Sequence, residues 1–356
     1  MQIQAAAPLA PLTTMRVGGP AERLVTATTT DEVVDAIREV DDADEPLLVI
    51  SGGSNLVIAD SGFPGTVVRI ATKGVRVESD DRCGGANVRV AAGESWDGFV
   101  ERAVAEGWSG IEALSGIPGL TGATPVQNVG AYGQEVAQTI SQVVTWDRHE
   151  QQVRTFTNGE CAFTYRHSIF KASDRYVVLE TVFQLRIADL SAPVAYADLA
   201  SQLGVDLGAR VPLADARDAV LAQRRKRGMV LDPSDHDTWS CGSFFTNPIL
   251  TAEQSEAMLE RVAARLGPDV APPLFPASNG RVKTSAAWLI DRAGFGKGYA
   301  MPGPAALSTK HTLAITNRGE ASAADVAHLA RTVRDGVEDA FGVRLVNEPV
   351  FVGHSL

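Results

Sequence analysis

One stretch decides the fold of this chain: Ser115-Gly116-Ile117-Pro118-Gly119-Leu120-Thr121-Gly122-Ala123-Thr124-Pro125-Val126-Gln127-Asn128-Val129-Gly130-Ala131-Tyr132-Gly133. It combines glycines, small hydroxyl residues and amides with almost no charge. A backbone that packs against a large flat cofactor requires such residues, because glycine lets a ligand approach the main chain closely. A buried structural loop is the alternative, but long loops rich in Gly and Pro are uncommon unless they are functional. We therefore interpret this stretch as a ligand-binding loop.

A second glycine-rich segment, Ser51-Gly52-Gly53-Ser54-Asn55, directly follows the apolar run Leu47-Leu48-Val49-Ile50. Such a run is typical of a short buried strand, and successive N–H groups of the turn after it can point at an anion. The segment matches neither the GxGxxG nor the P-loop pattern, and an ordinary turn between strands is the alternative. Together the two segments suggest a two-part ligand, with a pyrophosphate at one and a ring system at the other.

Composition excludes several classes of protein. The chain has 356 residues, of which 45% are hydrophobic and 21% charged, as in a soluble globular protein of two or three packed units. Its net charge of −11 argues against nucleic-acid binding, which calls for clustered Lys and Arg. The basic run Arg224-Arg225-Lys226-Arg227 is short and fits a local anion site better.

Cysteine usage and the N-terminus indicate the compartment. Three cysteines lie far apart without a CxxC pair, which argues against a disulfide framework and against a metal site. The N-terminal residues lack the basic start and apolar run of a signal peptide. No stretch approaches the ~18 apolar residues of a membrane helix. We expect a cytoplasmic protein that acts as a monomer without a membrane or nucleic-acid partner.

Periodic segments predict an α+β fold with mixed sheets. Helices are expected over residues 30–40 and 96–106, with several strand-like runs around and after them. A capping box, Thr251 with Gln254, predicts a helix that ends at Gly267, and Ser322 begins another that ends at Gly342. Composition shifts near residue 190, so we expect one domain over residues 13–190 and a second over residues 191–356. The last strand, residues 346–352, is expected to return to the active site.

Four motifs, in order along the chain, resemble one family. Gly116-Ile117-Pro118-Gly119 with Gln127 to Gly133 resembles the UDP-N-acetylenolpyruvoylglucosamine reductases. The other three motifs are Tyr165-Arg166-His167-Ser168, Gly242-Ser243-Phe244-Phe245-Thr246-Asn247-Pro248 and Asn347-Glu348-Pro349-Val350-Phe351. The resemblance implies a vanillyl-alcohol-oxidase/PCMH-type FAD-binding domain followed by a smaller α+β substrate-binding domain. It spans residues 13–352.

The resemblance also implies a reaction. NADPH would reduce non-covalently bound FAD, which would reduce UDP-N-acetylglucosamine enolpyruvate at C3 to give UDP-N-acetylmuramate for peptidoglycan. Ser243 corresponds to the proton donor to C2, and Arg166 to a catalytic arginine whose fork of donors suits a carboxylate. Glu348 corresponds to the family glutamate and could polarise the enol ether or relay a proton. Without the resemblance, these three residues would be a turn hydroxyl, a surface ion pair with Glu160 and a solvated carboxylate.

Further residues follow from the same resemblance. Both glycine-rich segments and Tyr165 are assigned to FAD. Tyr196 lies in a segment that resembles the tyrosine loop of the longer subclass, so it should contact the UDP-sugar. Asn247 is assigned to a diphosphate or sugar oxygen. Arg227 stands where the family has a diphosphate-binding lysine, and Lys226 is the alternative at that place.

The chain departs from the family pattern after the glutamate, where Pro349 and Val350 replace a valine-arginine pair. Two other functions remain open. A flavin oxidase of the same cofactor fold commonly tethers FAD to histidine, and neither glycine-rich segment contains one. A flavin-binding protein without turnover would have no need of Ser243, Arg166 and Glu348 together. Because no separate NADPH domain is recognisable, we expect NADPH and the UDP-sugar to use one pocket in turn.

Overall fold

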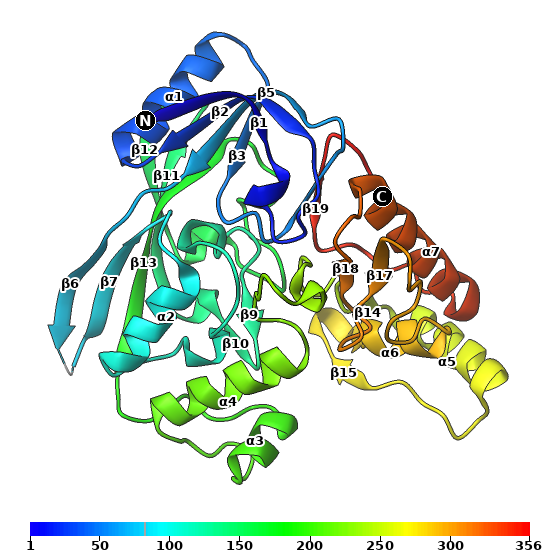
Figure 1. The fold of residues 1–356 in the computed structure, drawn as a ribbon. Helices are drawn as coiled ribbons and strands as arrows, with labels where there is room; N and C mark the ends of the chain where they lie inside the picture. Colours follow the sequence, from blue (N-terminus) through cyan, green and yellow to red (C-terminus); the bar gives the residue numbers. More distant parts are fainter. Residues whose placement is uncertain (82) are drawn as a thin grey trace. The chain divides into compact units, whose positions relative to one another are not determined.

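The computed structural model of the chain describes residues 1–81 and 83–356 (Figure 1). These residues form two compact units. Unit 1 comprises Met1–Ala7, Ala21–Gly53 and Pro64–Val230, and unit 2 comprises Pro8–Pro20, Ser54–Phe63 and Leu231–Leu356.

These units differ from the predicted domains, whose boundary was placed at residue 190. The structure divides the chain between Val230 and Leu231 instead, and it assigns two early segments to unit 2. The reason is packing: Val194, Leu199 and Val220 are buried in one apolar cluster with Ala113, which lies in unit 1. The change in composition near residue 190 therefore does not mark a change of core.

Unit 1 contains two main sheets. A four-stranded sheet has the order β1-β2-β5-β3, and a larger antiparallel sheet has the order β12-β11-β13-β7-β6, with β8 added to β13. The strands of unit 1 are β1 (Gln2–Pro8), β2 (Pro20–Ala27), β3 (Leu47–Ile50), β5 (Phe63–Ile70), β6 (Val75–Asp81), β7 (Gly85–Ala91), β8 (Trp108–Ser109), β9 (Gly130–Ala131), β10 (Gln134–Glu135), β11 (Ile140–Asp147), β12 (Gln152–Thr157) and β13 (Tyr176–Ile187).

Unit 1 also contains α-helices. They are α1 (Thr30–Asp42), α2 (Trp96–Ala105), α3 (Ala197–Leu203) and α4 (Leu213–Lys226). The apolar face of α1 packs beside β3, and Trp96 and Phe99 of α2 are buried in the same core as Phe183 of β13 (Figure 1). The helices predicted over residues 30–40 and 96–106 are thus confirmed.

Unit 2, all of whose residues are described, is built from short strands and three α-helices. Its elements are β4 (Leu56–Ile58), β14 (Ile249–Leu250), α5 (Ala252–Leu266), β15 (Leu274–Pro276), β16 (Val282–Thr284), α6 (Ala286–Arg292), β17 (Ala305–Leu307), β18 (Ile315–Asn317), α7 (Ala323–Phe341) and β19 (Val350–Val352). Strand β19 pairs in parallel with β4, which joins the C-terminal segment to residues from the first part of the chain.

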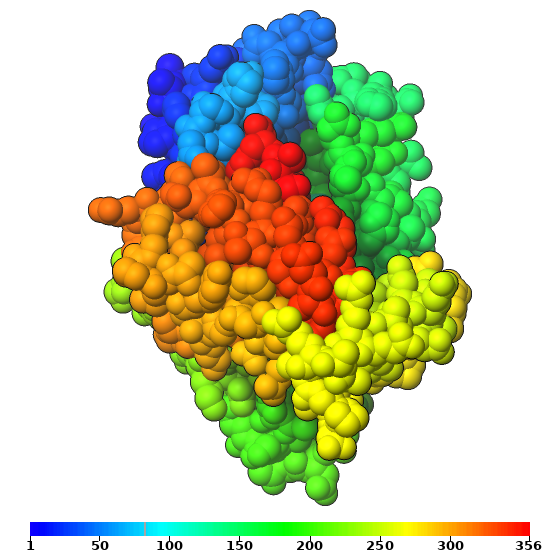
Figure 2. Space-filling view, turned by 90° about the vertical axis from the view of Figure 1, so that its right-hand side faces the viewer, coloured from blue at the N-terminus to red at the C-terminus, as the bar shows by residue number. Residues whose placement is uncertain are grey.

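The two long helices of unit 2 begin as the sequence predicts. Thr251 and Gln254 form the expected capping box of α5, and Ser322 forms one with Asp325 at the start of α7. The two helices pack against each other, and Figure 2 shows the yellow atoms of α5 beside the orange-red atoms of α7. Among the described residues, no helix is both long enough and apolar enough to cross a membrane.

Candidate functional site

The two glycine-rich segments meet in unit 1. Ser51 directly follows β3, and a Cβ atom built on Gly52 would lie 2.6 Å from the Cα atom of Gly119. Real Cβ atoms essentially never approach another atom so closely, so the two backbones can touch only because Gly52 has no side chain. A single ligand that uses both segments requires this proximity.

Ser51 carries a buried hydroxyl oxygen that has no hydrogen-bond partner among the described residues. A buried polar atom without a partner costs about 1–3 kcal/mol, so such an atom calls for a ligand or an ordered water. Gly53 beside it has a φ of 58°, a conformation that favours glycine. This cradle fits an oxygen-rich group such as a pyrophosphate.

The middle of the long loop is fixed to the large sheet. The N–H of Thr121 donates to the carbonyl of Glu94 at 2.8 Å, and the N–H of Gly122 donates to that of Ala92 at 2.9 Å. A Cβ atom on Gly122 would lie 2.4 Å from the Cβ atom of Ala92, so only glycine fits here. The loop is therefore held as a rigid platform.

Asn128 supports the loop with its side chain. Its Nδ2 donates to the Glu135 carboxylate at 2.9 Å and to the Thr164 carbonyl at 3.0 Å, and its Oδ1 accepts from the Ala137 N–H at 3.1 Å. Both N–H donors of the amide are therefore used within the protein. A contact of Asn128 with FAD stays a prediction, and it would have to come from the backbone or from the amide oxygen.

Arg166 lies at the tip of a tight turn in unit 1. Thr164 and His167 exchange backbone hydrogen bonds of 3.0 and 3.1 Å around it, and its φ is 55°, which is uncommon for a residue other than glycine. The Nη2 of Arg166 donates to the carbonyl of Gly130 at 2.8 Å, and its guanidinium carbon lies 5.2 Å from the centre of the Tyr165 ring. The turn thus holds the guanidinium beside the glycine-rich loop.

Tyr196 rests on the same loop. Its ring meets Tyr132 edge-on, with 5.8 Å between the ring centres, and 51% of the residue is exposed. A Cβ atom on Gly133 would lie 2.7 Å from the Cβ atom of Ala195, so the glycine permits this close approach. An exposed aromatic ring at this place is available to a substrate, and its contact with the UDP-sugar stays a prediction.

Arg227 is joined to the segment that carries Tyr196. It caps the C-terminal end of α4, and its Nη2 lies 2.8 Å from the carboxylate of Asp198, in the first turn of α3. Lys226 is exposed to solvent. The choice between Arg227 and Lys226 as the diphosphate ligand stays a prediction.

Ser243 and Glu348 lie on adjacent stretches of backbone in unit 2. The N–H of Glu348 donates to the carbonyl of Phe244 at 2.8 Å, and the side chain of Asn55 donates to the carbonyl of Glu348 at 3.2 Å. The N–H of Val350 returns a hydrogen bond of 2.9 Å to the carbonyl of Asn55. Three predicted site residues that are far apart in the sequence are therefore close together in unit 2.

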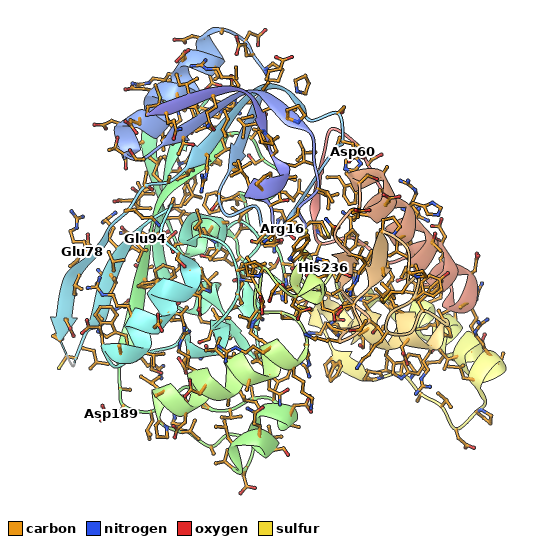
Figure 3. The ribbon with its side chains drawn as sticks, viewed as in Figure 1. Arg16, Asp60, Glu78, Glu94, Asp189 and His236 are labelled. Carbon is orange, nitrogen blue, oxygen red and sulfur yellow. The ribbon has the colours of Figure 1, made fainter. Side chains whose placement is uncertain are left out.

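The segment before Ser243 is anchored by contacts of Arg16 and His236 with the Trp239 ring. The guanidinium carbon of Arg16 lies 4.0 Å from the centre of the Trp239 ring, and His236 meets the same ring at 4.4 Å between centres. Figure 3 shows Arg16 and His236 close together in unit 2. Trp239 is therefore a packing residue of this segment.

Asn247 also has an internal partner. Its Oδ1 accepts from the N–H of Ala286 at 3.0 Å, at the start of α6. The amide nitrogen can still donate, and its predicted contact with a diphosphate or sugar oxygen stays a prediction.

Comparison with known proteins gives matches along most of the chain. The C-terminal domain of UDP-N-acetylenolpyruvoylglucosamine reductase matches residues 232–352, and an FAD-binding domain matches residues 21–148. The UDP-N-acetylenolpyruvoylglucosamine reductase of Streptomyces avermitilis is 61% identical over 98% of this chain and 95% of its own length. That of Thermobifida fusca is 57% identical over 98% of each.

The chain belongs to the UDP-N-acetylenolpyruvoylglucosamine reductase family. A crystal structure of the reductase from Thermus caldophilus is 25% identical, covers 99% of both chains and superposes with a TM-score of 0.66. The predicted fold class is therefore confirmed: a PCMH-type FAD-binding domain accompanies the C-terminal domain of the reductase family. The family model begins at residue 232, close to the start of the last segment of unit 2.

Unit 1 of this reductase-family chain fits FAD. Residues 51–53 with the unpartnered Ser51 hydroxyl would hold phosphate oxygens, and the platform of residues 115–133 would support the rings. The roles of the site residues predicted from the sequence stay predictions.

Two residues near the loops escaped the sequence analysis. Glu112 is only 2% exposed, and its carboxylate accepts from the N–H groups of Gly110 and Ala192 and from the side chain of Gln134. It thereby joins the base of the Tyr196 segment to the glycine-rich loop. Arg224 packs against Gly116. A single Glu such as Glu112 cannot be identified as a site residue from the sequence. Arg224 could have been, because it lies in the basic run that suggested an anion site.

Proposed function

We propose that this chain reduces UDP-N-acetylglucosamine enolpyruvate to UDP-N-acetylmuramate with NADPH, as a cytoplasmic monomer that supplies peptidoglycan synthesis. The observation that carries the proposal is the joint presence of two glycine-rich cradles in contact and of Ser243 beside Glu348. The names of the relatives support the same reaction. FAD, which the two glycine-rich segments would hold, would supply the hydride transfer from NADPH to C3 of the enolpyruvyl group.

The residues of the chain then manage charge and protons. Electron density left on C2 and on the adjacent carboxylate is stabilised by a fixed cation, the role we assign to Arg166. Its turn and its hydrogen bond to Gly130 hold the guanidinium in one orientation before the substrate binds. Ser243 donates its hydroxyl proton to C2. A serine hydroxyl is a weak acid, so this transfer succeeds only because C2 is strongly basic at that moment.

Glu348 is placed by its backbone, which is fixed on both sides by Phe244 and Asn55. We assign it to polarising the enol ether or to relaying a proton to Ser243. Tyr196, Asn247 and Arg227 (or Lys226) would bind the UDP-sugar through stacking, an amide donor and a guanidinium or ammonium charge.

The test separates the two half-reactions under anaerobic conditions. The purified protein is reduced with NADPH, UDP-N-acetylglucosamine enolpyruvate is added, and the absorbance of oxidised flavin is followed. Rapid return of the oxidised band supports the proposal. Reduction that persists until air is admitted rejects this substrate and favours an oxidase, and the absence of any flavin after FAD is supplied overturns the proposal at its first step.

Steady-state kinetics test whether NADPH and the UDP-sugar use one pocket in turn. Parallel initial-velocity lines with inhibition by excess substrate are expected, because each substrate must leave before the other enters. Intersecting lines would show that both bind together.

A further inference from the structure

Asp237 is a buried carboxylate in the segment that leads to Ser243. It lies in unit 2, in the short 3-10 helix η6 (His236–Thr238), and only 4% of it is exposed. Its Oδ1 accepts from the N–H of Thr309 at 2.9 Å and from Nη1 of Arg318 at 2.8 Å, and its Oδ2 accepts from the Thr309 hydroxyl at 2.5 Å. Two residues that are distant along the chain therefore direct three donors at one side chain.

These donors keep Asp237 ionised. Burial by itself would raise the pKa of its carboxyl group, but the hydrogen bonds from Thr309 and the charge of Arg318 outweigh it and hold the pKa below its usual range. A second ion pair lies beside it, since Nζ of Lys310 donates to the carboxylate of Asp235. Separating a buried ion pair leaves an uncompensated charge, so the pair of Asp237 with Arg318 disfavours other arrangements of the two segments.

The partner segment, residues 309–318, also holds the chain on the other side of Ser243. The N–H of Phe244 donates to the carbonyl of Leu313 at 2.8 Å. Residues 309–318 thus bind the chain at Asp237, before Ser243, and at Phe244, directly after it. The backbone that carries the reactive hydroxyl is therefore attached to one segment at both ends.

Packing does not fix the backbone immediately before Ser243. Gly242 has a φ of 73°, and a Cβ atom added there would meet no described residue within 4 Å apart from its chain neighbours. Its N–H donates to the hydroxyl of Ser240 at 3.2 Å, and Ser240 forms a β-bridge with Thr316. The position of Ser243 therefore depends on the polar attachments around it, of which the Asp237 cluster is the most buried charge.

We infer that Asp237 is a positioning residue for Ser243. Together with Thr309 and Arg318, it fixes the place from which the Ser243 hydroxyl reaches C2 of the enolpyruvyl group. This inference rests on the proposed function, in which Ser243 donates a proton. A proton donor must lie within hydrogen-bonding distance of the atom that it protonates, and a displacement of about 1 Å can slow a reaction roughly 100-fold. Asp237 acts through the backbone and does not touch the substrate in this role.

The experiment compares Asp237→Asn with the control Asp269→Asn, at an exposed aspartate of the same unit. Reduction of the FAD-loaded protein by NADPH and its reoxidation by UDP-N-acetylglucosamine enolpyruvate are followed separately by anaerobic stopped flow. In Asp237→Asn, we expect reduction at the wild-type rate and reoxidation slowed by about 10- to 100-fold. The solvent deuterium isotope effect on reoxidation should rise, because protonation by Ser243 then limits the rate. Asp269→Asn should match the wild type in both half-reactions.

Two variants of Thr309 guard against a folding defect in Asp237→Asn. Thr309→Val removes only the hydroxyl group, so the backbone N–H and Arg318 still reach the carboxylate, and reoxidation should slow by less than in Asp237→Asn. Thr309→Ser keeps the hydroxyl group and should reoxidise at the wild-type rate. A variant that is partly unfolded loses amplitude in both half-reactions, but its isotope effect stays that of the wild type.

Two results would overturn the inference. A wild-type reoxidation rate in Asp237→Asn, with an unchanged isotope effect, would show that the carboxylate does not position Ser243. Equal losses in both half-reactions for Asp237→Asn and Thr309→Val would show that the cluster serves folding alone. In both cases the proposed reductase function would stand, whereas failure of the UDP-sugar to reoxidise the reduced wild-type protein would overturn that function and the inference with it.

Discussion

The loop of residues 115–133 in unit 1 and the loop of residues 240–248 in unit 2 are held by different means. The first is fixed by oriented hydrogen bonds, among them that from the N–H of Gly116 to the Asp97 carboxylate and those from the Asn128 amide to Glu135 and Thr164. The second also has hydrogen bonds, such as that from the N–H of Glu348 to the carbonyl of Phe244, but it adds apolar packing, since Phe244 and Phe245, which follow Ser243, are 0% and 1% exposed. A loop that supports a large polar cofactor needs many oriented donors, whereas one reactive hydroxyl needs only a fixed backbone.

Removing the reactive group without its support should have the largest effect. In Ser243→Ala, NADPH should still reduce the flavin, but reoxidation by the UDP-sugar should slow by about 10²–10⁴-fold, the range for loss of a positioned proton donor. Stopped-flow measurement of each half-reaction checks this. Ser234→Ala, an exposed serine of the same unit, should behave as wild type. Equal loss of both half-reactions would show that Ser243 is structural.

Removing the apolar support of the second loop should have the next largest effect. Phe244→Ala should lower the free energy of unfolding of unit 2 by about 3–5 kcal/mol, the usual cost of truncating a buried aromatic ring. Phe275→Ala is the matched control, because Phe275 is 51% exposed and should cost little. Chemical unfolding followed by tryptophan fluorescence measures both variants. Similar losses for the two would contradict the apolar support of this loop.

Two buried thiols report on the units separately. Cys161 lies in unit 1 and Cys241 in unit 2, and burial raises the pKa of each thiol to about 12. With the exposed Cys83 replaced by serine, Phe244→Ala should accelerate labelling of Cys241 by a thiol reagent more than that of Cys161. Equal acceleration would mean that the units open together.

Removing the Glu112 carboxylate, which accepts hydrogen bonds next to the first loop, should lower the free energy of unfolding by less. Glu112→Ala leaves the N–H groups of Gly110 and Ala192 and the Gln134 amide without their acceptor, at about 1–3 kcal/mol. Because Ala192 leads to Tyr196, KM for the UDP-sugar should rise more than kcat falls. Glu101→Ala, whose side chain is 74% exposed, is the control. A fall in kcat alone would show that Glu112 does not position this segment.

The smallest effect should come from an ion pair at the end of β11. The hydrogen bond from Arg175 holds the pKa of Asp147 at about 2, below the ordinary 3.8. The stability that it contributes is therefore present above about pH 4 and is lost as the pH falls toward 2. Asp147→Asn should melt below wild type at pH 6, and the two should converge near pH 2. Glu150→Gln, at an exposed neighbour of Arg175, should melt at almost the same temperature as wild type at both pH values.

The sequence by itself determined the family and the glycine-rich loops, and it predicted the reactive residues. These features are local. They are the spacing of glycines, capping boxes such as Thr251 with Gln254, and short motifs made of neighbouring residues. The fold class followed because the motifs stand in the family order along nearly the whole chain. Even Arg224 was present in a basic run that suggested an anion site.

Only the tertiary structure decided which of these residues meet. It placed Gly52 against Gly119 and Asn55 beside Glu348, and it moved the boundary between the units from residue 190 to residue 230. It also distinguished Arg224 from Arg227, through a buried Nε in one and an ion pair with Asp198 in the other. The physical reason is that burial and pairing depend on residues that are distant along the chain. Which of these residues come close in space is set by packing rather than by any local pattern.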